Sequence, residues 1–223
     1  MKALFQCTMV LLALGIFVAC GNSPKGEAAK TSDKTEKPAE PTAASSKYQV
    51  DVQNSSVMWT GTKPIGDAHS GTIKLKGGEL AVAGGNITAG SFEFDMNSIE
   101  NTDMKAGDGK EKLEEHLKSA DFFDVTAYPT AKFTVTGAQP VTGKAGVTHQ
   151  LTGNLTMRDQ TKSITFDVNV AQLSDRVTAV TPSFTINRTE WGVNYHSGIL
   201  GTVKDQLIND DVALVINLVA TPQ

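Results

Sequence analysis

The stretch from Gln150 to Val170, QLTGNLTMRDQTKSITFDVNV, carries the clearest structural signal in the sequence. Its first half places an apolar residue or glycine at every second position: Leu151, Gly153, Leu155 and Met157. Its second half repeats the pattern at Ile164, Phe166, Val168 and Val170. Alternation with a period of two is typical of a strand with one buried face. The stretch therefore predicts two antiparallel strands joined by a turn at Arg158–Thr161.

The same alternation recurs on both sides of this hairpin. It appears at Val57–Thr60, Thr72–Leu75, Phe92/Phe94/Met96, Ala131/Phe133/Val135, Phe184/Ile186 and Val212/Leu214/Ile216/Leu218. Turns are predicted at Gly77–Gly78 and Gly84–Gly85. One segment, Lys110–Lys118, is rich in helix formers and has leucines at helical spacing. We predict an all-β fold of about eight antiparallel strands with one short amphipathic helix, arranged as a sandwich or a closed barrel.

The first twenty residues are typical of an export signal. Lys2 precedes an apolar run from Ala3 to Ala19, which is short for a membrane span of about 20 residues. The run ends at Val18-Ala19-Cys20-Gly21, which is similar to the lipidation motif of bacterial lipoproteins, although Phe17 stands where leucine is usual. We predict a signal peptide over 1–19 and a lipidated Cys20 that holds the protein on a membrane. The alternative is an ordinary secretory peptide.

Residues 20–46 differ in composition from the rest of the chain. Gly21–Ser46 contains no Val, Ile, Leu, Met, Phe, Tyr or Trp, and its lysines and acidic residues balance. Such a composition buries too little apolar surface to offset the entropy of ordering. We predict a disordered tether over 20–46 and one folded domain over 47–223. By analogy with lipoprotein sorting, Gly21 after the cysteine favours the outer membrane of a bacterial envelope, on its periplasmic or its surface face.

Composition excludes several classes of function. The formal net charge of −4 argues against a nucleic-acid partner. Only two cysteines occur, Cys7 and Cys20, so the domain has no disulfide framework and no catalytic cysteine. The sequence also lacks nucleotide-binding and hydrolase motifs, and its four histidines are scattered. We therefore predict no catalytic residues, no metal site and no cofactor.

Arg188 has two interpretations at this level. It follows the strand-like run Phe184–Asn187 and precedes Trp191, and a lone arginine at a strand end can hold an anionic head group bidentately. The alternative is a structural ion pair, or a cation–π contact with Trp191. We prefer the structural role.

Several blocks of the domain resemble the YceI-like family in the correct order. They are Ser56–Gly61 with His69-Ser70-Gly71, His116–Val125 followed by Tyr128–Phe133, Gly153–Thr156, Phe184–Gly192 and Ile208–Val212. The resemblance covers essentially Lys47 to Ala220. One departure is Asn187 before Arg188, where related sequences often have aspartate.

The resemblance implies a lipocalin-like, eight-stranded antiparallel barrel that holds a polyisoprenoid or similar amphiphile. On this basis we expect a non-enzymatic envelope lipoprotein that binds a quinone, a polyprenyl phosphate or a related lipid. The alternatives are a structural or stress-response protein with a filled barrel, and an enzyme acting on such a lipid. The sequence leaves open whether the chain forms a homodimer.

Candidate ligand-binding residues follow from the inward faces of the predicted strands and from the predicted mouth. The candidates for the wall are Trp59, Phe92, Phe94, Phe133, Leu155, Phe166, Phe184 and Ile216. The candidates for the mouth are Arg188, Trp191 and Tyr195.

Overall fold

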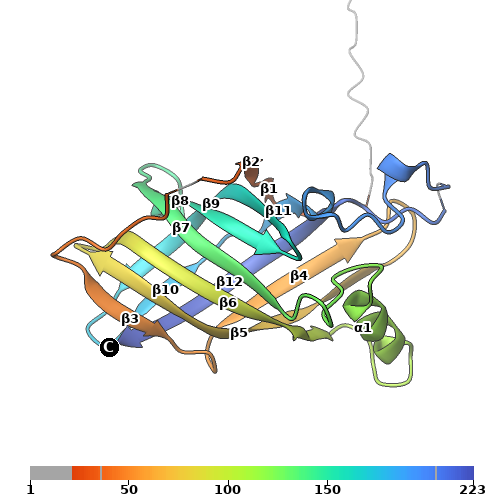
Figure 1. Ribbon diagram of the computed structural model, residues 1–223, viewed down its shortest axis with the longest axis horizontal. Coiled ribbons are helices and arrows are strands. Elements are labelled where there is room, and N and C mark those ends of the chain that lie inside the picture. Colours follow the sequence, from red (N-terminus) through yellow and green to blue (C-terminus); the bar gives the residue numbers. More distant parts are fainter. Residues whose placement is uncertain (1–21, 36, 204) are drawn as a thin grey trace, which may run out of the picture.

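The computed structural model describes residues 22–35, 37–203 and 205–223 (Figure 1). The predicted signal peptide, residues 1–19, and Cys20 lie outside these ranges. The strands are β1 (Glu27–Ala28), β2 (Lys30–Asp33), β3 (Ser46–Val50), β4 (Ser56–Thr62), β5 (Ala68–Ala83), β6 (Asn86–Asn101), β7 (Thr130–Pro140), β8 (His149–Met157), β9 (Gln160–Gln172), β10 (Val177–Val180), β11 (Phe184–Asn187) and β12 (Asp211–Pro222). One α-helix, α1 (Lys110–Lys118), and two 3-10 helices, Arg188–Trp191 and Gly198–Leu200, complete the elements.

The strands form a closed antiparallel ring. The chain order β5-β6-β7-β8-β9-β10 is also the pairing order, and β10 pairs with β12. The last strand, β12, then pairs with β3 and β4, which both pair with β5 and together fill one position of the ring. Both β10 and β11 pair with the same side of β12 and fill another position. The ring thus has eight positions, and the prediction of an eight-stranded barrel is confirmed.

The hairpin predicted over Gln150–Val170 is β8–β9. Met157 pairs with Gln160 across a tight turn, and Leu151 pairs with Phe166 further along. Arg158 in the turn adopts a positive φ of 53°. Every second side chain of β8 is buried, beginning with His149, so the alternation correctly identified the inward face.

The helix occupies the predicted residues and lies at one end of the barrel, at the lower right of Figure 1. Polar contacts tie it to the end of β6. The Glu114 carboxylate accepts a hydrogen bond from the Asn101 N–H at 2.8 Å, and the Lys110 ammonium donates to Glu100 at 3.0 Å. Among the described residues, no helix has the length and apolar character needed to cross a bilayer.

The turn predicted at Gly77–Gly78 is wrong. Both glycines lie within β5, next to a shift in its register with β6. A Cβ on Gly78 would come within 2.8 Å of the Ser91 carbonyl oxygen and 2.9 Å of the Phe92 ring. The glycine therefore allows β6 to approach closely, whereas Gly84–Gly85, with φ values of 56° and 80°, does form the predicted turn.

The segment before the barrel also differs from the prediction of a disordered tether. Its strand β1 pairs in parallel with β11, and β2 pairs in antiparallel with β9. The segment, which we call the N-terminal strap (residues 25–35), therefore lies between β9 and β11, where those strands diverge. Its order comes from backbone hydrogen bonds to open strand edges, which require no apolar side chains, and from the absence of proline between Gly26 and Thr35.

Candidate functional site

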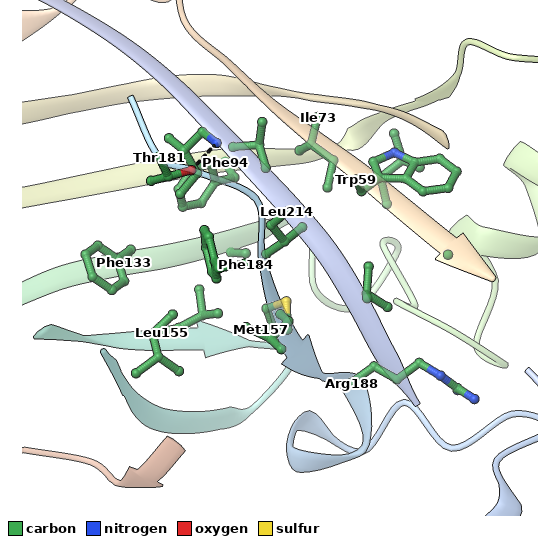
Figure 2. Close-up of a pocket in the computed structure, with 18 of the residues that line it drawn as sticks. Trp59, Ile73, Phe94, Phe133, Leu155, Met157, Thr181, Phe184, Arg188 and Leu214 are labelled. Atoms are coloured by element: carbon green, nitrogen blue, oxygen red, sulfur yellow. Dashed lines mark hydrogen bonds between the residues drawn. The ribbon is translucent and has the colours of Figure 1, made fainter. Parts of the chain in front are cut away.

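The barrel encloses a cavity of about 260 Å³ (Figure 2). This is far larger than the roughly 10–15 Å³ that a single water needs. At one end the lining consists of buried side chains such as Leu80, Ile87 and Val168. At the other it includes the exposed residues Lys63 and Asp67. The cavity therefore opens at the end that carries α1, which we call the open end, and is sealed at the opposite, closed end.

A row of phenylalanines crosses one wall of the cavity. Phe166 and Phe184 stack with ring centres 4.6 Å apart and planes 4° from parallel. Phe133 lies 5.6 Å from Phe166, and Phe92 lies 6.4 Å from Phe133. The row joins β6, β7, β9 and β11 and presents a continuous apolar surface, which suits a hydrocarbon chain.

Gly153 makes this row possible. It lies on β8, between the strands that carry Phe133 and Phe166. A Cβ at this position would lie 2.3 Å from the Phe133 ring and 2.7 Å from the Thr134 carbonyl oxygen. The missing side chain leaves space in which Phe133 lies over β8 and reaches toward Phe166.

Trp59 lines the cavity from β4 and is 8% exposed. A glycine again provides the space, because a Cβ on Gly71 would lie 2.6 Å from the indole ring. The indole Nε1–H is buried and has no hydrogen-bond partner within the described residues. Leaving a buried donor unpaired costs about 1–3 kcal/mol, so Trp59 is the least satisfied polar group of the wall.

The remaining polar side chains of the inner wall are few. The Thr181 hydroxyl accepts a hydrogen bond from the Ile216 N–H at 2.9 Å, drawn as a dashed line in Figure 2. The Thr62 hydroxyl accepts one from the Asn209 side chain at 2.6 Å. Both oxygens are thus engaged with the barrel, and the lining around them is aliphatic and aromatic. Such a wall favours an apolar guest.

The guanidinium of Arg188 is hydrogen bonded to acceptors of the protein itself. Its Nη1 donates to the Val193 carbonyl at 2.7 Å, and its Nε donates to the Asn209 carbonyl at 3.2 Å. Its Nη2 donates to the Ile208 carbonyl and to the Asp210 carboxylate, both at 3.2 Å.

The side chain of Arg188 is 4% exposed, and its guanidinium points away from the phenylalanine row in Figure 2. Burial lowers the pKa of Arg188, while the adjacent Asp210 acts to raise it. The geometry supports the structural ion pair over the head-group contact. Asp210 is the partner, and Asn187 instead caps the following 3-10 helix by accepting from the Thr189 N–H.

Trp191 and Tyr195 are outside the cavity lining. Trp191 is fully buried, and its indole N–H donates to the Leu155 carbonyl at 2.9 Å, so it packs behind the wall. The Tyr195 ring lies 4.7 Å from the His116 ring and 5.2 Å from the Phe122 ring. It therefore anchors the loop that follows Trp191 to the end of the helix.

Nine of the eleven candidate side chains do line the cavity: Trp59, Phe92, Phe94, Phe133, Leu155, Phe166, Phe184, Arg188 and Ile216. The aliphatic lining also includes residues that were not proposed as candidates. Met157, Ile164 and Leu214 follow the strand alternation, and Leu113 and Leu117 follow helical spacing. These patterns could have identified all five as lining residues. Thr181 follows neither pattern, because it lies in the break between β10 and β11.

Among the described residues that line the cavity, one histidine is paired with a carboxylate. His69 lines the mouth, and its Nδ1 lies 3.0 Å from the Asp103 carboxylate. Burial acts to raise the pKa of Asp103, but hydrogen bonds from the Ser70 N–H, His69 and Asn101 outweigh it and lower the pKa. Within the described ranges, no group of three or more His, Cys, Asp or Glu side chains could hold a metal ion.

The residues that form the barrel match a family model. The model of the YceI-like domain matches residues 48–220. The chain belongs to the YceI-like family. The matched residues include the whole cavity lining, so the site lies within the family domain.

Curated sequence relatives are named UPF0312 proteins or YceI. A UPF0312 protein of Pectobacterium carotovorum is 31% identical over 125 residues, which are 52% of this chain and 55% of that protein. The protein YceI of Shigella flexneri is 33% identical over 90 residues, 40% of this chain and 39% of that protein. The YceI-like chain thus matches about half or less of the length of these curated relatives.

Solved structures share the fold. BcnA of Burkholderia cenocepacia has a TM-score of 0.54 at 21% identity and covers 77% of this chain and 99% of its own. A domain from Saccharophagus degradans, described as polyisoprenoid binding, has a TM-score of 0.55 at 17% identity and covers 79% and 98%. At these identities the likeness concerns the lipocalin-like barrel alone.

Proposed function

We propose that this protein is a bacterial envelope lipoprotein that binds or carries a long-chain isoprenoid, such as a quinone or a polyprenyl phosphate, or a similar amphiphilic lipid. The observation that carries the proposal is the apolar cavity with its row of phenylalanines, open at one end and sealed at the other. The Saccharophagus domain, whose description names polyisoprenoid binding, has the same fold and supports the choice of ligand class.

The physics of transfer explains the shape of the site. A membrane is as apolar as the barrel, so moving a lipid chain from one to the other gains little from the hydrophobic effect. Selectivity then depends on the length and shape of the cavity and on contacts at the mouth. Because Arg188 is engaged by protein acceptors, we expect the wall to select the chain more strongly than any single cation selects a head group.

The binding proposal is tested with the purified protein. Native mass spectrometry and organic extraction should reveal a bound lipid, or titration with quinones should quench the fluorescence of Trp59. Polyprenols and fatty amides are then tested by displacement of a bound quinone. The Trp59→Phe variant, which retains Trp191 behind the wall, identifies the responding ring. Absence of both a co-purified lipid and any binding would overturn the proposal in favour of a barrel without a ligand.

An enzyme acting on the bound lipid is a second candidate, and the His69–Asp103 pair at the mouth favours it. A histidine held by a carboxylate is the orienting half of a nucleophilic site. Within the described residues, however, no serine, threonine or cysteine side chain is hydrogen bonded to His69. Hydrolysis of a lipid ester that is lost in His69→Ala would favour the enzyme, and equal lipid binding without turnover favours the carrier.

The lipoprotein part of the proposal depends on Cys20, the cysteine at the predicted cleavage site. Several acyl chains on one residue hold a protein on a membrane far better than a single chain. The Cys20→Ser variant should fail to incorporate radiolabelled palmitate, and Cys7→Ser is the matched control because it lies inside the predicted leader. Labelling that survives Cys20→Ser would contradict lipidation at this residue.

A further inference from the structure

Exposed aliphatic side chains gather on two loops at the open end. Ile65 lies on the loop of residues 63–67 and is 59% exposed. Ile199 and Val203 lie on the loop of residues 198–207 and are 72% and 59% exposed. These are the three most exposed of the large hydrophobic side chains described. A group of exposed apolar residues on a soluble surface commonly marks an interaction site.

The two loops are neighbours, and both border the mouth. The Asn209 N–H donates to the Thr62 carbonyl at 2.9 Å, which joins the end of the second loop to the start of the first. Lys63 and Asp67 from the first loop and Ile208 after the second line the cavity. The exposed aliphatic residues therefore lie on the rim through which a ligand enters.

The chain also leaves the barrel at this rim. The Asn22 side chain donates to the Gly66 carbonyl at 3.1 Å, and the Asn22 carbonyl accepts from the Asn209 side chain at 2.9 Å. Cys20 precedes Asn22 by two residues, a reach of about 7 Å at most. The anchor proposed at Cys20 would therefore hold a bilayer next to the open end.

We propose that the two rim loops form a membrane-contact surface, which docks the open end of the cavity on a lipid bilayer. Ile65, Ile199 and Val203 enter the outer layer of the bilayer, and the mouth then faces lipid rather than water. An apolar chain can pass between bilayer and cavity without crossing the aqueous phase. The role in transfer rests on the proposed lipid binding, whereas docking itself does not.

The charges on the loops determine the kind of contact. Lys63 and Asp67 on the first loop have opposite signs, and the second loop contains the equally balanced pair Lys204 and Asp205 in its sequence. Without an excess of positive charge, attraction to anionic lipids is weak. Three aliphatic side chains alone bind a bilayer reversibly, and an anchor at Cys20 would keep the surface close to it by raising its effective concentration.

Fluorescent labels at the two ends of the barrel test the docking. The chain from Asn22 onward contains every described strand and no cysteine, so single cysteines can be introduced as Ile65→Cys and Ile199→Cys. Leu173→Cys is the matched control, because Leu173 is 51% exposed in the β9–β10 turn at the closed end. Each variant carries an environment-sensitive nitrobenzoxadiazole dye and is mixed with vesicles of phosphatidylethanolamine and phosphatidylglycerol.

We expect the emission to rise and shift to the blue at positions 65 and 199 and to remain unchanged at 173. No change at any position, or an equal change at all three, would overturn the proposal. The signals at 65 and 199 should persist in high salt, because the contact is apolar. Loss of both signals in salt would show electrostatic adsorption and would also contradict the proposal.

A second measurement separates docking from lipid binding. Serine replacements at Ile65, Ile199 and Val203 should slow the transfer of a fluorescent polyprenol from vesicles several-fold, relative to Leu173→Ser. Affinity for the same polyprenol in detergent should be unchanged. Equal transfer rates in both variants would overturn the role of the rim. Failure of every variant and of the unmodified protein to bind in detergent would instead overturn the proposed function, while the dye experiment still tests docking.

Discussion

The two ends of the barrel are held together by different means. At the closed end the β5–β6 and β9–β10 turns are short, and side chains interlock across them. The Gln172 amide donates to the Tyr48 hydroxyl at 2.8 Å, and its oxygen accepts from the Gly85 N–H at 3.2 Å. At the open end, α1 and the longer loops that flank it surround the mouth (Figure 1). Arginine side chains donate hydrogen bonds to carbonyl groups of these loops.

The barrel is therefore sealed at one end by strand turns, and its mouth is shaped at the other end by loops that side chains hold in place. The β5–β6 turn at the closed end leaves few backbone groups unpaired, because its strand ladder extends to Ala83 and Asn86. Loops at the open end carry carbonyl groups without strand partners, and each of these needs a donor. Arg188 supplies several donors at once, so it holds the loops that border the mouth.

The largest expected effect on stability comes from removing the hydrogen bonds of Arg188. Arg188→Met should lower the free energy of unfolding by about 3–5 kcal/mol, because it leaves Asp210 and several carbonyl groups without their partner. Urea denaturation followed by circular dichroism measures the change. Arg158→Met is the control at the same end, because Arg158 bonds only the Phe122 and Gly192 carbonyls. A loss below about 1 kcal/mol for Arg188→Met would show that the core alone holds the mouth.

Filling the cavity between the two ends should have a smaller effect on stability and a clear one on ligand choice. Leu155→Trp adds a large ring to the lining and should cost about 1–3 kcal/mol. If the protein remains folded, the longest polyprenol that binds should become shorter than for the unmodified chain. Leu173→Trp, in an exposed turn, should alter neither property. An unchanged preference in a folded Leu155→Trp variant would contradict a guest chain that reaches this depth.

The N-terminal strap, which fills the gap in the barrel wall between β9 and β11, offers a weaker test of how the open end is held together. Toward the open end the N-terminal strap lies between β9 and β11, and the Asn154 side chain holds Thr35 by accepting from its N–H at 2.8 Å and donating to its carbonyl at 2.6 Å. Asn154→Ala should cost about 1 kcal/mol and should hasten tryptic cleavage after Lys30. Cleavage at the unmodified rate would show that pairing with β9 alone holds the strap.

The smallest expected effect lies at the closed end and depends on pH. His149 is buried, and its two ring nitrogens contact Thr148 and Asn86. Burial lowers the pKa of His149 below its usual 6.5. In the unfolded chain this histidine therefore takes up a proton at a higher pH than in the folded one, so stability is lost as the pH falls below about 6.5.

His149→Gln removes this titration and keeps an amide donor near Asn86. Stability measured from pH 7.5 to pH 5 should therefore fall less steeply in the variant than in the unmodified protein, while the two differ least at the upper end. Parallel curves would contradict a buried neutral histidine at the closed end.

Strand periodicity predicted most of the cavity wall but not the roles of its polar residues. The alternation in β8 and β9 correctly assigned Leu155 and Phe166 to the interior, because a strand sends successive side chains to opposite faces. The turn predicted at Gly77–Gly78 was wrong, because glycine serves equally in a turn and where another strand approaches closely. Local sequence does not distinguish these two uses.

The roles of the polar groups could not be predicted, because their partners are distant in sequence. Asp210 meets Arg188 only after β12 returns to the barrel, and β9 meets the strap across more than a hundred residues. The composition of residues 20–46 predicted disorder, because a segment with so few apolar residues can bury little apolar surface. Composition gives no information about open strand edges elsewhere in the protein that can pair with such a segment.

The all-β class, the short helix over Lys110–Lys118 and the inward faces of the main strands could be predicted from the order of residues in the chain. These features depend on side-chain order along a single element, which periodicity records directly. The three-dimensional fold was needed to show that the barrel has one open end, that Arg188 binds its own loops, and that Asn22, Ile65 and Ile199 meet at one rim. Those features arise where segments far apart in the chain come together, and the geometry of a closed ring alone sets which segments meet.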